Sequence, residues 1–183
     1  MSAPTITAAL LARDNEDDIA SCLESVAWAD ERLVILDTRS TDRTAAIART
    51  MGARVVPHPF RNFAEQRDVG LRHARGEWLF YIDTDERATP ELAEEIRRAV
   101  TDDAHVGWWV PRRNWIWERE IRHGGWYPDH QLRLLRVGCA RFDPARPVHE
   151  VALLDGSAGY LCEPLLHENY RTLAQYIATQ RHY

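Results

Sequence analysis

Over the first half of the chain, short apolar runs of strand length alternate with segments whose apolar residues recur at helical spacing. The apolar runs predict strands at Thr5–Leu11, Arg32–Leu36, Arg54–Val56 and Trp78–Ile82. The segments between them predict helices, one of them over Phe63–Ala74. Strands that alternate with helices indicate an α/β fold, with a mostly parallel sheet flanked by helices on both faces.

Polar and small residues predict where these elements begin and end. Candidate N-cap residues precede three of the helices: Asn15, Ser40 or Thr41, and Thr89 with Pro90 after it. Gly52 is a candidate end for the second helix, and Pro57 is expected to stop the third strand.

Two aspartates stand at the ends of predicted strands, Asp37 after the second and Asp83 after the fourth. Ligands of open α/β sheets bind beyond the carboxyl ends of the strands. We therefore expect Asp37 and Asp83 to converge on one crevice.

The second half of the chain, from about residue 106, is rich in tryptophan and arginine, and Gln131–Val137 predicts a further strand. Residues 106–149 hold 8 arginines and 4 acidic residues, a net charge of +4, whereas residues 1–105 hold 13 arginines and 20 acidic residues, a net charge of −7. A basic segment suits an anionic partner and an acidic one suits metal ions, although ordinary solvated faces explain the charges equally well. No linker separates the halves, which predicts a single domain over residues 1–183.

Composition excludes several protein classes. The 183 residues have a net charge of −5 and 45% hydrophobic residues, as expected of a globular protein. The N-terminal apolar run is too short for a signal peptide or a membrane span. Three widely separated cysteines argue against a disulfide framework and favour a reducing compartment, so a cytoplasmic location is expected.

Asp83 and Asp85 flank one residue directly after a buried strand. Mg2+ and Mn2+ prefer oxygen ligands and commonly pair a protein carboxylate with substrate phosphates. A helix-capping turn explains the same residues about as well, as a plain N-cap loop does for Asp37. The sequence has no glycine-rich phosphate loop, Walker motif or G-x-S-x-G, which disfavours dinucleotide, ATP and serine-hydrolase chemistry.

Taken together and in order, six segments resemble family 2 glycosyltransferases of the GT-A fold. They are Ala12–Glu16, Cys22–Val26, Asp37–Thr44, Tyr81–Glu86, Arg122–Leu134 and Pro147–Glu150. The last two narrow the likeness to bacterial lipopolysaccharide core glucosyltransferases. The resemblance implies a GT-A type sheet, with a Rossmann-like nucleotide-sugar-binding half over 1–105 and an acceptor-binding half over 106–183. It also implies that relatives continue beyond Tyr183, so the chain is expected to be truncated at its C-terminus.

On the donor side, the resemblance implies that Asp37 contacts the uracil of a UDP-sugar and that Arg67 lies near the base. Asp83 contacts the ribose or the metal, and Asp85 and His167 hold a divalent ion, Mg2+ or Mn2+. Taken alone, Arg67 is also explained as a surface residue and His167 as a structural histidine.

On the acceptor side, the resemblance assigns Asp129 as the catalytic carboxylate, and a turn residue that caps backbone N–H groups is the alternative. The candidate acceptor contacts are Arg122, Trp126, His149 and Glu150, each of which a structural role also explains. The implied partner is a lipid-linked oligosaccharide at the cytoplasmic face of the inner membrane, and no nucleic acid is expected.

The implied reaction is transfer of a hexose, glucose, with inversion. Three alternatives stay open: a glycosyltransferase with another acceptor, a nucleotidyltransferase, and a non-catalytic nucleotide-sugar-binding domain. Two residues depart from the family pattern: Arg39 replaces a small residue, and Asp68 replaces an asparagine.

Overall fold

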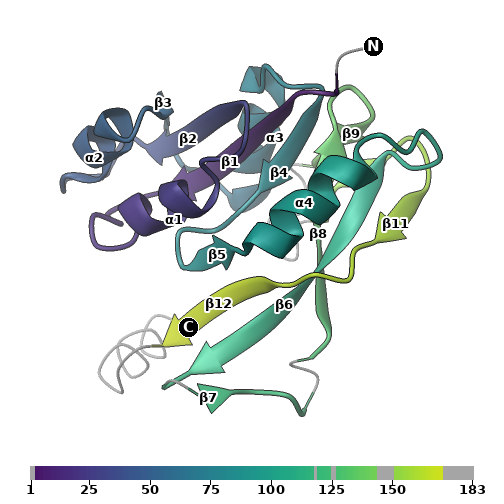
Figure 1. Ribbon diagram of the computed structural model, residues 1–183. Coiled ribbons are helices and arrows are strands. Elements are labelled where there is room, and N and C mark those ends of the chain that lie inside the picture. Colours follow the sequence, from purple (N-terminus) through teal and green to yellow (C-terminus); the bar gives the residue numbers. More distant parts are fainter. Residues whose placement is uncertain (1–2, 118, 125–126, 144–150, 171–183) are drawn as a thin grey trace.

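The computed structural model describes residues 3–117, 119–124, 127–143 and 151–170. Its central feature is a mixed sheet with the strand order β3-β2-β1-β4-β8-β6-β12-β5, which helices flank (Figure 1). The first four of these strands run parallel to one another, and β8 runs antiparallel to both β4 and β6. The predicted α/β fold is therefore confirmed.

The helices are α1 (Ile19–Ser25), α2 (Thr44–Thr50), α3 (Phe63–His73) and α4 (Pro90–Ala99). The strands of the first half are β1 (Ile6–Ala12), β2 (Glu31–Asp37), β3 (Arg54–His58), β4 (Trp78–Tyr81) and β5 (Glu86–Ala88). The strands of the second half are β6 (Gly107–Ile116), β7 (Arg119–Glu120), β8 (Asp129–Arg136), β9 (Ala140–Arg141), β10 (Leu153–Leu154), β11 (Ala158–Tyr160) and β12 (Leu165–Tyr170).

Helices cover both faces of the sheet, as predicted. Successive side chains of a strand point to opposite faces, so Leu10 of β1 joins the core formed with α1, α2 and α4, whereas Ala9 joins the core formed with α3. Figure 1 shows α3 behind the sheet and the other three helices in front. None of the helices in the described part of the chain is long and apolar enough to cross a membrane.

Several predicted boundaries are confirmed. The Thr89 hydroxyl accepts a hydrogen bond from the Leu92 N–H at 3.1 Å, and Pro90 is the first residue of α4. Gly52 follows α2 with a φ of +78°, which is the left-handed conformation that glycine adopts without strain.

Three other boundaries were predicted wrongly. Asn15 does not cap α1: the N-cap residue is Asp18, and the Asn15 side chain accepts from the Arg13 N–H at 2.8 Å.

Neither Ser40 nor Thr41 caps α2: the helix begins at Thr44, its N-cap residue is Arg43, and the Asp42 carboxylate accepts from the Thr44 N–H at 2.9 Å. Thr41 N–H donates instead to the carboxylate of Asp14 at 2.8 Å.

Pro57 does not stop β3, which runs to His58. Because β3 lies at the edge of the sheet, proline is tolerated there although it has no N–H to donate to a neighbouring strand.

Candidate functional site

A network of charged and polar side chains lies where β4, β5, β6, β8 and β12 meet. It runs from one carboxylate of the Asp83–Asp85 turn to the other through neighbouring ion pairs and hydrogen bonds. We call this the carboxyl-edge network, and its members in order are Asp83, Arg133, Glu86, Arg112, Asp129, Asn114, His167 and Asp85.

Two arginines hold Asp83 at the end of β4. Arg133 donates to both of its oxygens, at 3.2 Å from Nη1 to Oδ1 and through Nη2 to Oδ2, and the Arg67 Nη2 lies 3.4 Å from Oδ1. Desolvation works to raise the pKa of Asp83, but the Arg133 and Arg67 guanidiniums outweigh it and hold the pKa well below its usual value. Asp83 is therefore ionised at neutral pH.

Arg67 is oriented by the packing of α3 on β4. Gly70 of α3 leaves room for the Tyr81 side chain, since a Cβ there would lie 2.5 Å from the Tyr81 hydroxyl oxygen. That hydroxyl donates to the Arg67 carbonyl, and the Arg67 guanidinium lies 5.1 Å from the centre of the Tyr81 ring. The arginine therefore points along β4 to the strand end instead of into solvent.

Glu86 is the fully buried centre of the network. Its Oε1 accepts from Arg133 Nη2 at 3.0 Å and from Arg112 Nη1 at 3.3 Å. Its Oε2 accepts from the backbone N–H of Asp83 at 2.9 Å. Glu86 thus fixes both the two arginines and the turn that carries Asp83 and Asp85.

Asp129 begins β8 and faces Arg112 of β6 in register. Its Oδ2 accepts from Arg112 at 2.9 Å (Nε) and 2.5 Å (Nη2), and its Oδ1 accepts from Gln131 Nε2 at 2.7 Å. Burial works to raise the pKa of Asp129, but the hydrogen bond and charge of Arg112 outweigh it and lower the pKa below its usual value. Asp129 is therefore an ionised carboxylate.

Asn114 joins Asp129 to His167. Its Nδ2 donates to Asp129 Oδ2 at 3.4 Å, and its Oδ1 lies 2.7 Å from His167 Nδ1. Because a carboxylate only accepts, the amide must turn its nitrogen to Asp129 and its oxygen to the histidine. A neutral His167 then carries its proton on Nδ1 and its lone pair on Nε2.

That lone pair faces Asp85, with 3.3 Å between His167 Nε2 and Asp85 Oδ2. Two acceptors at this distance repel each other unless a cation or a proton lies between them. An imidazole nitrogen and a carboxylate oxygen are both ligands of Mn2+, and a partner on the other ring nitrogen is usual for metal-bound histidine. The donor set therefore fits a divalent ion, although no group of three such protein ligands occurs among the described residues.

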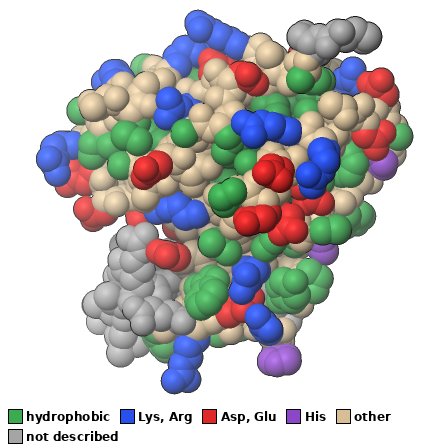
Figure 2. All heavy atoms as spheres, in the orientation of Figure 1, with side chains coloured by type: hydrophobic (Ala, Val, Ile, Leu, Met, Phe, Trp, Pro, Cys, Tyr) green, Lys and Arg blue, Asp and Glu red, His purple; other side chains and the backbone are tan. Residues whose placement is uncertain are grey.

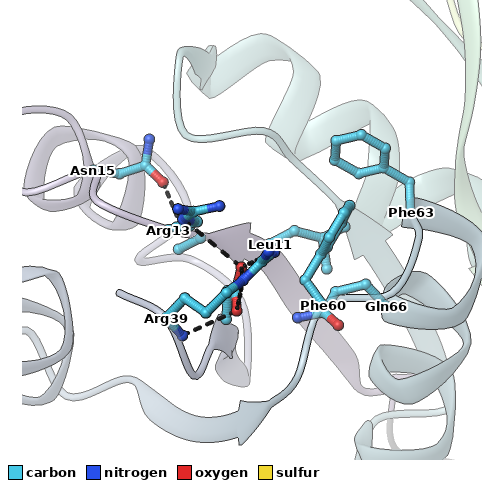
Figure 3. Close-up of a pocket in the computed structure, with 9 residues that line it drawn as sticks. Leu11, Arg13, Asn15, Arg39, Phe60, Phe63 and Gln66 are labelled. Carbon is cyan, nitrogen blue, oxygen red and sulfur yellow. Dashed lines mark hydrogen bonds and ion pairs between the residues drawn. The ribbon is translucent and has the colours of Figure 1, made fainter. Parts of the chain in front are cut away.

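A separate pocket of about 290 Å3 lies at the ends of β1 and β2 (Figure 3). Its apolar wall consists of Leu11, Ala12, Phe60 and Phe63, and its polar lining of Arg13, Asn15, Asp37, Arg39 and Gln66. Asp37 and Asp83 lie on either side of β1, so about two strand spacings, roughly 10 Å, separate them along the edge. Both aspartates lie at this edge of the sheet, but Asp37 lines the pocket and Asp83 belongs to the network, so the two do not share one crevice as predicted.

Of the four expected acceptor contacts, Arg122 lies among the described residues. Arg122 is exposed and donates to Glu120 at 2.9 Å (Nε) and 2.6 Å (Nη2). The hydrogen bonds of Arg113 and then of Arg122 lower the pKa of Glu120 to about 2. Trp126, His149 and Glu150 lie outside the described residues.

Comparison with known proteins decides the family. The model of the family described as "Glycosyl transferase family 2" matches residues 8–165, which is most of the chain. The chain belongs to glycosyl transferase family 2.

Within this family, the chain is 33% identical over 165 residues to the lipopolysaccharide core biosynthesis glycosyltransferase LpsC of Rhizobium meliloti. The match covers 84% of this chain but only 59% of LpsC. The expected resemblance to lipopolysaccharide core enzymes is thereby confirmed.

Two solved structures show the same fold. S. aureus TarS has a TM-score of 0.67 at 14% identity, over 90% of this chain and 60% of that one. Glucosyl-3-phosphoglycerate synthase from Mycobacterium tuberculosis, crystallised with Mn2+, UDP and its product, has a TM-score of 0.61 at 19% identity, over 97% of this chain and 76% of that one. The GT-A fold expected from the sequence is confirmed.

The sequence did not single out Glu86, Arg133 or Asn114 for the site. Arg133 carries a signal in retrospect, because it interrupts the apolar run Leu132–Leu135 in a strand between two others. Asn114 carries none, because its contacts depend on the register of β12 on β6, which pairs it with His167.

Proposed function

We propose that this family 2 domain is an inverting glycosyltransferase that moves a hexose, glucose, from a UDP-sugar to a lipopolysaccharide core or related lipid-linked acceptor. The observation that carries the proposal is the carboxyl-edge network. In it, the side chain of Asn114 joins the ionised carboxylate of Asp129 to His167, which faces Asp85, and we assign Asp85 and His167 as the metal ligands.

The donor fits along the carboxyl edge of the sheet. In this proposal the base occupies the pocket that Asp37 and Arg39 line, and the ribose lies toward Asp83 and Arg67. Asp85 and His167 would hold Mg2+ or Mn2+, which would neutralise charge on the departing diphosphate. Support comes from the family and from the synthase of the same fold, which was crystallised with Mn2+ and UDP.

The chemical step is a single displacement. The acceptor oxygen forms a bond to the anomeric carbon, the bond from that carbon to the diphosphate oxygen breaks, and UDP leaves with the electron pair. Asp129 takes the proton of the acceptor hydroxyl. Arg112 and Gln131 hold the carboxylate in place, and Arg112 keeps it ionised until the proton arrives.

The first prediction tests the metal site. Asp85→Asn keeps the shape of the turn but removes a charged ligand, and Asp85 already faces a histidine lone pair. We expect UDP binding in Mn2+ to weaken at least tenfold, a typical loss when one ligand or its support is removed. Titration calorimetry of UDP with Mn2+ and with EDTA measures it.

Asp155→Asn is the matched control, because Asp155 is an exposed carboxylate that pairs only with Arg141 in the described contacts. Unchanged Mn2+-dependent UDP binding in Asp85→Asn would remove the metal site from the proposal. Absence of UDP release from UDP-glucose with a lipopolysaccharide core acceptor, in the unaltered protein, would overturn the transferase assignment.

The acceptor surface is proposed at the end of β6 and at β7. Trp117 and Tyr127 expose 48% and 47% of their surface there, and Arg122 is exposed beside them in sequence. Figure 2 shows hydrophobic, basic and histidine side chains together at this lower end. Aromatic side chains with arginines suit an anionic, membrane-linked acceptor at the cytoplasmic face of the inner membrane.

The second prediction concerns the salt dependence of acceptor binding. Exposed arginine contacts with an anionic acceptor are screened as ionic strength rises, so acceptor affinity should fall between 0.05 M and 0.5 M salt. Arg122→Ala should weaken binding and flatten this dependence, whereas Arg141→Ala, at the opposite end of β8, should do neither. Co-sedimentation with lipopolysaccharide micelles measures both, and a flat salt profile in the unaltered protein would contradict the proposed surface.

A further inference from the structure

The carboxylate of Asp37 is already occupied, and its main partner is Arg39. Arg13 Nε lies 3.8 Å from Oδ2, and the Phe60 backbone N–H also donates to the carboxylate. Its Oδ1 accepts from the Arg39 backbone N–H at 3.0 Å and from Arg39 Nε at 3.2 Å. Its Oδ2 accepts from Arg39 Nε at 3.0 Å and from Nη2 at 2.7 Å. These bonds lower the pKa of Asp37 to about 2, and the side chain is only 3% exposed.

Arg39, by contrast, faces the pocket. Its side chain is 53% exposed, and its guanidinium lies 5.6 Å from the centre of the Phe60 ring. Figure 3 shows Arg39 on one side of the pocket, with Phe60 and Phe63 on the other. The bonds to Asp37 use Nε and Nη2, so Nη1 has no partner among the described residues and is the donor left for a ligand.

We propose that Arg39 is the residue that contacts the nucleobase in this pocket and that Asp37 acts through it as a positioning residue. The inference rests on the proposed function, because it assumes that the pocket takes the base of a nucleotide donor. It differs from the expectation that the sequence raised, in which Asp37 itself contacts uracil.

The chemistry of the pocket indicates the class of base. A guanidinium only donates, so it recognises carbonyl oxygens, and uracil has two of them. The apolar wall of Leu11, Phe60 and Phe63 suits a flat ring better than a phosphate. Adenine offers only ring nitrogens as acceptors, beside an amino group that donates, so Arg39 favours uracil over adenine.

The test is a double-mutant cycle of UDP binding in Mn2+, with Asp37→Asn, Arg39→Met and the double variant. We expect Arg39→Met to bind UDP 10- to 100-fold more weakly, because the variant loses a hydrogen bond donated by a charged group. Asp37→Asn should also weaken binding in the unaltered background. In the Arg39→Met background, Asp37→Asn should change affinity less than twofold, because the residue through which it acts is gone.

Arg43→Met is the matched control on the same loop, because Arg43 is 79% exposed and pairs with Glu16 outside the pocket. A second measurement needs only Arg39→Met and this control. The ratio of the UDP affinity to the ADP affinity should fall about tenfold in Arg39→Met and stay unchanged in Arg43→Met. This comparison holds even if Asp37→Asn fails to fold.

Two outcomes overturn the inference while leaving the proposed function standing. Equal losses from Asp37→Asn in both backgrounds would show that Asp37 contacts the base directly. Unchanged or tighter UDP binding by Arg39→Met would show that Arg39 only covers the carboxylate. Failure of the unaltered protein to bind UDP in Mn2+ would instead overturn the proposed function, and the inference with it.

Discussion

Asp129→Asn should lower the rate of sugar transfer by about 10²- to 10⁴-fold while leaving UDP binding in Mn2+ intact. The amide has nearly the shape of the carboxylate but cannot take the proton of the acceptor hydroxyl. Asp129 is 23% exposed, so the acceptor can reach it, and its contacts hold it at the start of β8. UDP release at saturating donor measures the rate, and calorimetry measures donor binding.

The fold should survive this substitution, because Arg112 keeps its second partner, Glu86, at 3.3 Å. Asp103→Asn is a suitable control, since its carboxylate is 93% exposed and 3.6 Å from Arg136. Near-normal transfer by Asp129→Asn would remove Asp129 as the base. Loss of UDP binding together with transfer would assign it to the structure of the donor site instead.

The acid side of the rate profile gives an independent check on Asp129. A carboxylate base works only while ionised, and Arg112 holds the pKa of Asp129 below the ordinary value of about 3.9. Transfer by this base should therefore not decline from loss of its charge until the pH falls below about 4. The lowered pKa also makes it a weaker base, which places the expected loss in Asp129→Asn toward the lower end of the range.

The elements of the first half were predictable because their signals are local. Each signal is contained within a few residues: an apolar run that ends at Asp37, a Thr-Pro pair at the start of α4 and a glycine after α2. The error at the start of α2 arose because a side chain distant in sequence intervened. Asp14 takes the N–H of Thr41, so the chain enters α2 later than the capping residues suggested.

The carboxylates of the candidate site were predictable from the sequence, but the side chains that contact them were not. Asp83 and Asp85 were identified because they follow a buried strand, and Asp129 and His167 only through the family resemblance. The contacts of Glu86 depend on three strands that meet far from one another in sequence, β5, β6 and β8. The spacing of residues along the sequence therefore does not predict these contacts.

The buried part of the network makes a strong prediction about stability. Arg133→Met should lower the free energy of unfolding by about 3–5 kcal/mol, the usual cost of removing one partner of a buried ion pair. Arg133 is 5% exposed, and Glu86, one of its two partners, is fully buried. Methionine replaces most of the apolar stem, so the loss is mainly that of charge and hydrogen bonds. Urea unfolding at neutral pH measures it.

Arg141→Met is the matched control, because it makes the same substitution in an ion pair of 2.6 Å whose partners are 59% and 61% exposed. An exposed pair contributes about 0–1 kcal/mol, so this variant should be nearly as stable as the unaltered protein. The contrast tests burial as the cause, because both variants remove an arginine from a close ion pair and differ in the exposure of the partners. Equal losses in both variants would contradict the argument.

The pH dependence separates lost charge from lost packing in Arg133→Met. Arg133 is the largest of the charges that hold the pKa of Asp83 below its unfolded value, against the opposing effect of desolvation. A carboxyl whose folded pKa is depressed stabilises the fold above its unfolded pKa of about 3.9, and this stability is lost as the pH falls through the folded pKa. The difference in stability between the unaltered protein and Arg133→Met should therefore be full at neutral pH and narrow below about pH 4. A difference that stays constant from pH 7 to pH 3 would mean that Arg133 stabilises the fold through packing alone.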